Sequence, residues 1–141
     1  MLKMYNTDIK TNKTKETDEF LKGNWINMVA PTEEEIKKVC KNVNIEEDFI
    51  RYALDYEEKA RIDYEEDDNT ILFIIDVPVI EVESGNKVYS TMPIGIIFVR
   101  DDYFITVSLT DNYIIQELEK KKNVITYKKS RLLLQIFYSN S

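Results

Sequence analysis

The side chains with the greatest chemical potential in this sequence are the carboxylates of one short segment. Residues 46–68, called here the acidic segment, hold eleven acidic side chains against three basic ones, a net charge of −8 in a chain of net charge −7. Such a run is typical of a solvated face. It also suits a hard divalent cation, which prefers oxygen ligands and needs several of them to converge. Both interpretations remain open at this stage.

Three side chains in the acidic segment have the spacing of a helix face. Asp48, Tyr52 and Asp55 are four and three residues apart, so in a helix they line one side, with Arg51 beside them. Asp48 and Asp55 are therefore the candidate metal ligands. Two carboxylates on one helix seldom complete a site, so another helix or subunit must supply the remaining oxygens.

The sequence lacks the side chains that several common catalytic mechanisms require. It has no histidine, which excludes Ser-His-Asp and Cys-His catalysis and imidazole-based zinc sites. Its three glycines are scattered, so no phosphate-binding loop forms. The single cysteine, Cys40, lies on an apolar helix stripe, so we expect it to be buried in the core. A single cysteine cannot form an internal disulfide, which suits a reducing compartment. We expect no catalytic residue, no required cofactor and no enzyme.

Charge also limits the partners of the chain. A sequence pI of about 4.7 argues against a nucleic-acid partner. One basic cluster near the C-terminus has no acid between its members, which are Lys120, Lys121, Lys122, Lys128, Lys129 and Arg131. It is interpreted either as a solvated helix end that complements the helix dipole, or as a contact for anionic lipid or an acidic neighbouring subunit.

Length and hydropathy predict one domain over residues 1–141. A chain of this length that is 43% hydrophobic and 32% charged can bury a core. Its apolar runs are far shorter than the ~20 residues that span a bilayer, and residues 1–10 lack the apolar stretch of a signal peptide. We therefore expect a soluble intracellular domain, with residues 1–22 as an N-terminal strand or arm of low order.

A short strand and two helices are predicted next. The strand around Trp25 stops at Pro31, and Thr32 with Glu35 makes a capping box for the first helix. Residues at helical spacing predict its buried stripe, which is Ile36, Val39, Cys40 and Val43. Asn44 and Glu47 offer a second cap. The second helix is expected to bury Phe49, Ile50, Ala53, Leu54 and Tyr56.

From residue 61 to residue 109 the hydrophobic period changes to two, which predicts a meander of four strands. A turn at residues 68–69 would place Tyr64 opposite Phe73, apolar against apolar. A turn at residues 101–102 would pair Phe98 with Ile105. That register puts two triplets on one face of the sheet, namely Ile94, Ile96 and Phe98 with Ile105, Val107 and Leu109.

The hairpin between these two turns contains two prolines. A turn at residues 85–86 would place Pro78 opposite Pro93. Neither proline has an amide to donate, so we expect the ladder to be bulged or broken there.

The C-terminal third predicts two more helices. The first runs from about residue 112 to residue 121, with Ile115 and Leu118 on its inner face, and an extended piece over residues 124–127 follows. Ser130 opens an apolar helix whose main face is expected to be Leu133, Ile136 and Phe137. Because no stop signal ends this helix, we expect residues 130–141 to be the start of a longer helix in a larger polypeptide.

Several motifs, taken in order, resemble the N-terminal cytoplasmic domain of the CorA-type magnesium and divalent-cation transporters. The resemblance spans residue 25 to the end of the chain. The motifs are Trp25-Ile26-Asn27 before a capped helix, the helix from Ile45 to Leu54, Lys59-Ala60-Arg61-Ile62-Asp63-Tyr64, the strand from Ile71 to Val82, Met92-Pro93-Ile94-Gly95-Ile96-Ile97-Phe98, Asp102-Tyr103-Phe104-Ile105-Thr106-Val107 and Arg131-Leu132-Leu133-Leu134-Gln135-Ile136.

This resemblance implies an α/β/α domain of class α/β (α+β), with a mixed, largely antiparallel sheet between layers of helices. It implies a place inside the cell beneath a pentameric channel, no catalysis, and Mg²⁺ as a regulatory ligand held between neighbouring subunits. The chain departs from the family pattern in two ways. It lacks the membrane helices and the Gly-Met-Asn pore motif, and the acidic pair of the second helix aligns with Arg51 and Tyr52. Asp48 or Asp55, one turn to either side, is the substitute.

The leading interpretation is thus the soluble cytosolic regulatory domain of a CorA-like magnesium transporter, at the cytoplasmic face of the membrane. Its partners would be the transmembrane region of the same protein and identical subunits in a pentamer. The rival is a soluble adaptor that binds another protein through its acidic face and has no membrane link.

Overall fold

A mixed seven-stranded sheet forms the centre of the computed structural model, which describes residues 1–120 and 124–140. Its order is β2-β1-β3-β7-β6-β5-β4, and every neighbouring pair is antiparallel except β3 and β7, which are parallel. This confirms the predicted mixed, largely antiparallel sheet. The strands are β1 (Leu2–Thr7), β2 (Thr14–Thr17), β3 (Asn24–Val29), β4 (Arg61–Glu65), β5 (Thr70–Glu83), β6 (Asn86–Val99) and β7 (Tyr103–Ser108).

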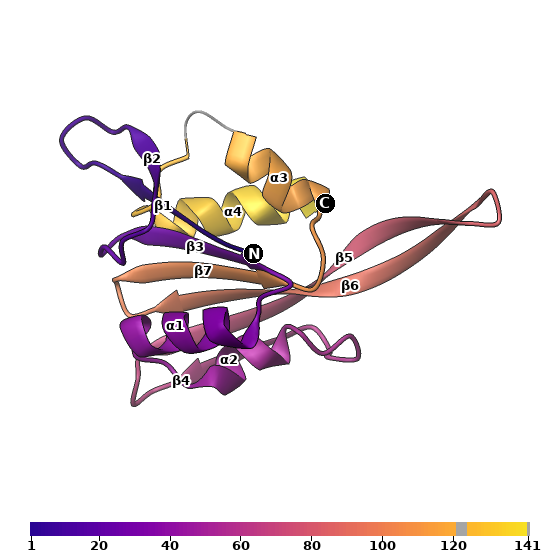
Figure 1. The fold of residues 1–141 in the computed structure, drawn as a ribbon, viewed down its shortest axis with the longest axis horizontal. Coiled ribbons are helices and arrows are strands. Elements are labelled where there is room, and N and C mark those ends of the chain that lie inside the picture. The colour runs from indigo at the N-terminus through magenta and orange to yellow at the C-terminus, as the bar shows by residue number, and fades with distance from the viewer. Residues whose placement is uncertain (121–123, 141) are drawn as a thin grey trace.

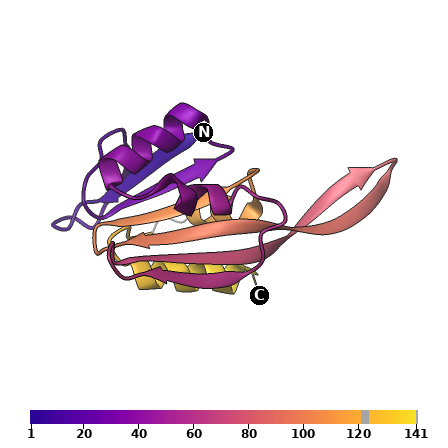
Figure 2. The ribbon, with the colours of Figure 1, turned by 90° about the horizontal axis from the view of Figure 1, so that it is seen from below.

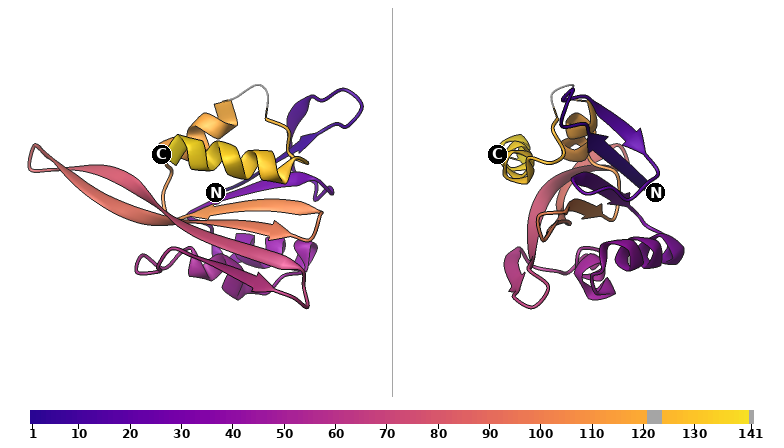
Figure 3. Two further views of the ribbon diagram at one scale, coloured as in Figure 1. Left: turned by 180° about the vertical axis from the view of Figure 1, so that it is seen from behind. Right: turned by 90° about the vertical axis from the view of Figure 1, so that its left-hand side faces the viewer.

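Helices cover both faces of the sheet, so the molecule has three layers (Figure 1; end-on in Figure 3). One face is covered by α1 (Glu33–Val43) and α2 (Glu47–Tyr52), the other by α3 (Tyr113–Lys120) and α4 (Lys129–Asn140). Each side has its own hydrophobic core. The α1 side is centred on Ile26, Leu72 and Ile105, and the α3 side on Trp25, Ile96 and Phe104.

The first helix begins as its cap predicts. The Thr32 hydroxyl accepts a hydrogen bond from the Glu35 amide at 3.1 Å, and the Glu35 carboxylate accepts one from the Thr32 amide at 2.9 Å. These bonds satisfy donors that the first turn leaves free. All four residues of the predicted stripe, Ile36, Val39, Cys40 and Val43, are buried.

The second helix is shorter than predicted, and its predicted cap is wrong. Asn44 does not open α2 but closes α1 in the left-handed conformation, with φ of 62°, and α2 starts after Glu46 without a side-chain cap. The helix ends at Tyr52. Phe49, Ile50 and Ala53 are buried as expected, whereas Tyr56 lies beyond the helix and is exposed.

The predicted register of β6 and β7 is wrong by one residue. Phe98 pairs with Phe104, not Ile105, because residues 100–102 form a three-residue turn in which Arg100 has φ of 50°. A slip of one residue reverses the face of every side chain. The triplet Ile94, Ile96 and Phe98 therefore lies on the face opposite to Ile105 and Val107. Both faces of these strands are buried, so the alternation of apolar residues cannot identify the register.

The β4–β5 register differs from the prediction by two residues. Tyr64 pairs with Ile71, since residues 66–69 form a four-residue turn with Asn69 at φ of 47°. A slip of two keeps each side chain on its predicted face. β4 is nevertheless an edge strand, and its Ile62 and Tyr64 are 68% and 58% exposed.

The β5–β6 hairpin is continuous through both prolines, which contradicts the predicted break. The two turn residues are Ser84 and Gly85, both with positive φ, so Pro78 pairs with Thr91 and Pro93 with Asp76. In such a hairpin the pair next to the turn is hydrogen-bonded, and hydrogen-bonded and non-hydrogen-bonded pairs alternate from there. Both prolines fall in non-hydrogen-bonded pairs, so neither needs an amide to donate to the other strand. Beyond the ends of β4 and β7 the two strands continue as a ribbon that projects from the body (Figures 1 and 2).

The two ends of the chain pack on the body. Residues 2–17 form the β1–β2 hairpin at the edge of the sheet. The predicted extended piece over residues 124–127 includes a turn at residues 126–127. The amide of Thr126 donates to the Thr7 hydroxyl, and the hydroxyl of Thr126 accepts from the Thr7 amide. α3 matches the prediction except that residue 121 lies outside the described part. α4 buries Leu132 and Ile136, whereas Phe137 is 38% exposed.

Gly95 provides a test of this packing. A Cβ at this position would lie 2.5 Å from the Cβ of Ala53 at the end of α2. We expect Gly95→Ala to lower the free energy of unfolding by about 2 kcal/mol, the usual cost of overpacking a core. In denaturant titrations, Ala53→Gly should recover most of that loss when the two are combined. Simple additivity of the two changes would contradict the predicted contact.

Candidate functional site

Four carboxylates of the acidic segment surround one groove. It has a volume of about 290 Å³ and lies between α2 and the edge strand β4. We call it the acidic groove. Its lining is Glu46, Asp48, Phe49, Tyr52, Asp63, Tyr64 and Glu65. Two tyrosines and a phenylalanine thus stand beside the carboxylates, so the groove offers apolar contact as well as negative charge.

The two predicted ligands are not brought together on one helix face. Asp48 lies in α2 and lines the acidic groove. Asp55 follows the end of the helix, and its Oδ1 accepts a hydrogen bond at 3.0 Å from the Glu57 amide, which stabilises a turn. The carboxylates that join Asp48 come instead from β4 and from Glu46. The alternation of polar and apolar residues over 61–65 is the sequence signal from which Asp63 and Glu65 can be placed on one side of a strand.

Carboxylate oxygen is the right ligand type for a hard cation, but the number of converging ligands is too small. Over residues 1–120 and 124–140 no three His, Cys, Asp or Glu side chains converge in a way that could hold a metal ion. Asp48 and Asp55 remain predicted ligands.

Arg51 in α2 forms ion pairs with two carboxylates. Its guanidinium donates to both carboxylate oxygens of Glu33 on α1, at 3.0 and 2.6 Å, and to Glu47 at 3.0 Å. These bonds raise the pKa of Arg51 and lower that of Glu33. Bidentate pairing fixes geometry as well as charge. Arg51 therefore ties α2 to α1 and cannot serve as a cation ligand.

A second arginine partly neutralises the other side of the groove. Arg61 donates to Asp63 at 2.7 Å and forms an ion pair with Glu58, and its guanidinium carbon lies 4.9 Å from the centre of the Tyr52 ring. Asp63 is therefore already engaged within the chain. Three groove carboxylates, Glu46, Asp48 and Glu65, have no such ion pair in the described part of the structure.

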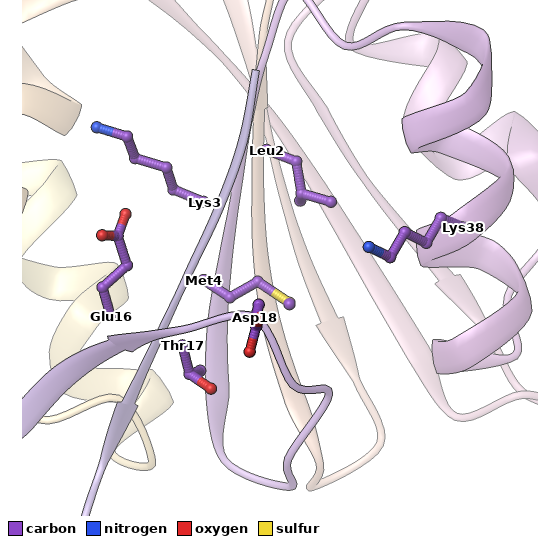
Figure 4. A pocket seen from close by; sticks show the side chains of 7 residues that line it. All are labelled: Leu2, Lys3, Met4, Glu16, Thr17, Asp18 and Lys38. Carbon is purple, nitrogen blue, oxygen red and sulfur yellow. The ribbon is translucent and has the colours of Figure 1, made fainter.

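A second groove is less suited to binding. It measures about 470 Å³ and lies between the β1–β2 hairpin and α1, as Figure 4 shows. Lys3 and Glu16 extend to one side of β1, whereas Leu2 and Lys38 lie on the other. Its charged groups do not converge on one point, so it presents no arrangement for a specific ligand.

The basic cluster divides into two kinds of residue. Lys120, Lys128 and Arg131 are exposed, and Lys121 and Lys122 lie outside the described residues. Lys129 has a side chain only 15% exposed, donates to the carbonyl of Arg100, and has its pKa lowered by burial. Lys129 is thus a structural contact rather than part of a surface for anions.

Cys40 is buried as the sequence predicts. Burial, reinforced by the charge of Glu47, raises the pKa of its thiol to about 11. Because the thiolate is the reactive form, this side chain is inert at neutral pH.

The ion pair of Arg51 can be tested by titration. The substitution Arg51→Gln should return the pKa of Glu33 towards its ordinary value, because the hydrogen bond from Arg51 is the main cause that lowers this pKa. A lowered carboxyl pKa stabilises the fold above the ordinary pKa, and that benefit is lost as the pH falls through the lowered value. Side-chain NMR titration gives the measurement. Arg61→Gln is the control and should leave Glu33 unchanged; an equal shift there would refute the assignment.

Solved structures of CorA share this fold. The complete structure of the CorA magnesium transporter from Methanocaldococcus jannaschii superposes with a TM-score of 0.75 at 24% identity, over 99% of this chain and 44% of the other. The soluble domain of CorA from the same organism gives 0.74 at 21% identity, over 98% and 54%. The chain thus spans about half the length of the structures that it matches. Among curated proteins, none matches its sequence.

The family comparison extends over most of the chain. Within the described residues no helix is long and apolar enough to cross a membrane. The profile of the CorA-like Mg²⁺ transporter protein matches residues 21–140, which include every element from β3 to α4. The chain belongs to the CorA-like Mg²⁺ transporter protein family.

Proposed function

We propose that this chain is the cytosolic regulatory domain of a magnesium transporter, placed at the cytoplasmic face of the membrane. The observation that carries the proposal is the family match over residues 21–140. In this role the domain performs no catalysis. It regulates a pore formed by a transmembrane region of the same protein, through contacts between identical subunits of a pentamer.

The second part of the proposal is that Mg²⁺ acts as a regulatory ligand at the acidic groove. Asp48 and Glu65 offer carboxylate oxygens there, and a neighbouring subunit supplies the rest of the site. Mutual repulsion of the carboxylates opposes close approach of two subunits, and a divalent cation relieves it. Asp55, which follows α2 and does not line the groove, is the other predicted ligand. The resemblance aligns the family's acidic pair with Arg51 and Tyr52, and the Arg51 guanidinium, which pairs with Glu33, offers no ligand to a cation.

A second function is favoured by one observation on the same surface. Tyr52, Ile62 and Tyr64 are 40%, 68% and 58% exposed beside the carboxylates of the acidic segment, on and next to the free edge of β4. An adaptor that binds a basic, apolar segment of another protein would use such a surface. This alternative needs neither magnesium nor a membrane link.

A chimaera tests the transporter role. Residues 1–141 would replace the matching part of the M. jannaschii CorA chain, and Mg²⁺ flux into vesicles would be measured with magnesium on the cytoplasmic side varied. We expect an assembled channel whose flux falls as that magnesium rises. A chimaera that assembles, yet conducts without responding to magnesium, would contradict a regulatory role. The control is the unmodified transporter in the same vesicles.

Thermal melts test the metal ligands separately. A cation that binds only the folded state adds ~1.4 kcal/mol at ten times its dissociation constant, which raises the melting temperature of a domain this size by roughly 3–6 °C. In the assembled chimaera, we expect Asp48→Asn to reduce the magnesium shift more than Asp55→Asn. Asp111→Asn, before α3, is the distant control.

Screening must be separated from binding in the same experiment. Sodium chloride at matched ionic strength relieves repulsion without site binding. Equal shifts in both salts would show that the acidic groove is only solvated, whatever the chimaera shows about transport.

A further inference from the structure

Arg100 has a backbone conformation that residues with a side chain rarely adopt. It stands in the turn between β6 and β7 with φ of 50°, in the left-handed region that glycine enters without strain. Residues are held in such conformations when surrounding contacts over-determine them, and such strain clusters at functional positions. The contacts of Arg100 therefore need an explanation beyond closing a turn.

Three separate groups of Arg100 make hydrogen bonds to three different elements. The guanidinium donates to the carbonyl of Val43, the last residue of α1. The backbone amide donates to the carbonyl of Asn69 at 2.9 Å. The backbone carbonyl accepts from the ammonium of Lys129, the first residue of α4.

These partners have a particular arrangement in the sequence and in the fold. Val43 and Asn69 lie just before and just after the acidic segment, so Arg100 holds both of its ends. Lys129 lies on the opposite face of the sheet, in the layer of α3 and α4 (Figure 3). One residue thus joins the acidic segment to α4 around the end of the sheet.

The Lys129 end of this connection is well fixed. Its side chain is 15% exposed, its ammonium lies 5.9 Å from the centre of the Phe98 ring, and Asp101 is 3.9 Å away. A buried ammonium needs partners for its charge, so displacement of α4 would leave Lys129 without the Arg100 carbonyl. Its neighbour Lys128 is exposed.

We propose that Arg100 is a coupling residue that transmits displacement between the acidic segment and α4. Loss of its contact at one end loosens the other end. The coupling is a property of this domain and does not depend on its role in transport. It provides a route by which an event at the acidic segment reaches the C-terminal helix on the other face.

Hydrogen exchange in the full chain tests the coupling from the α4 side. Lys129→Met removes the ammonium and keeps the length of the side chain. We expect the amides of Asn44 and Ile45, which bond to the Cys40 carbonyl at the end of α1, to exchange about fivefold faster relative to amides of β3. That factor corresponds to one hydrogen bond of ordinary strength. Lys128→Met, the matched control, should leave them unchanged.

The effect of Arg100 on α4 is tested with a variant that keeps the turn between β6 and β7. Arg100→Asn removes the guanidinium, and asparagine tolerates the left-handed conformation. We expect faster exchange of the Leu132 amide, which bonds to the Lys128 carbonyl in the first turn of α4. Ile115→Val, a mild core change on the α3 side, corrects for general loss of stability. The proposal is overturned if each variant alters only its own side of the sheet, or if Ile115→Val reproduces both patterns.

Discussion

The parallel pairing of β3 and β7 is the constraint on which the rest of the fold depends. Residues about 80 apart in the sequence meet there, and the pair is fixed by a buried network: the Trp25 indole donates to the Thr106 hydroxyl at 2.9 Å, which donates to Asn27 at 3.0 Å. Buried polar groups impose a register because leaving one unpaired is costly. From this pair the chain leaves to α1 on one face and to α3 on the other, so both faces must be covered.

Burial on both faces explains which predictions from the sequence succeeded. The α1 cap and stripe depend on local spacing, so Thr32, Glu35 and Ile36 identified the helix. The β6–β7 register depends on a choice between two apolar faces, and Ile105 looks as suitable opposite Phe98 as Phe104 does. Only the turn distinguishes them. Arg100 in the left-handed conformation carries no composition signal of the kind that a glycine would give.

The candidate site shows the same division between local and tertiary information. Sequence spacing placed Asp48 and Asp55 on one helix face, but α2 stops at Tyr52, and the groove is completed by a strand instead. The spacing does not reveal that α2 ends at Tyr52, just before Ala53 packs closely against Gly95. The acidic character of residues 46–68 was evident from composition. Which of its carboxylates share a groove depended on how β4 pairs.

Ion pairing within the chain decides which carboxylates remain for a partner. Arg51 engages Glu33 and Glu47, and Arg61 engages Glu58 and Asp63, so the charge of the segment is neutralised mainly away from Asp48 and Glu65. Exposed pairs of this kind add little to stability. Their consequence is geometric: the pairs of Arg51 tie α1 to α2, and the carboxylates Asp48 on α2 and Glu65 on β4, without an ion pair among the described residues, face the acidic groove from its two walls. In the proposed function such a surface is completed by a cation or by a positively charged partner, and in the proposed coupling Arg100 connects that event to α4.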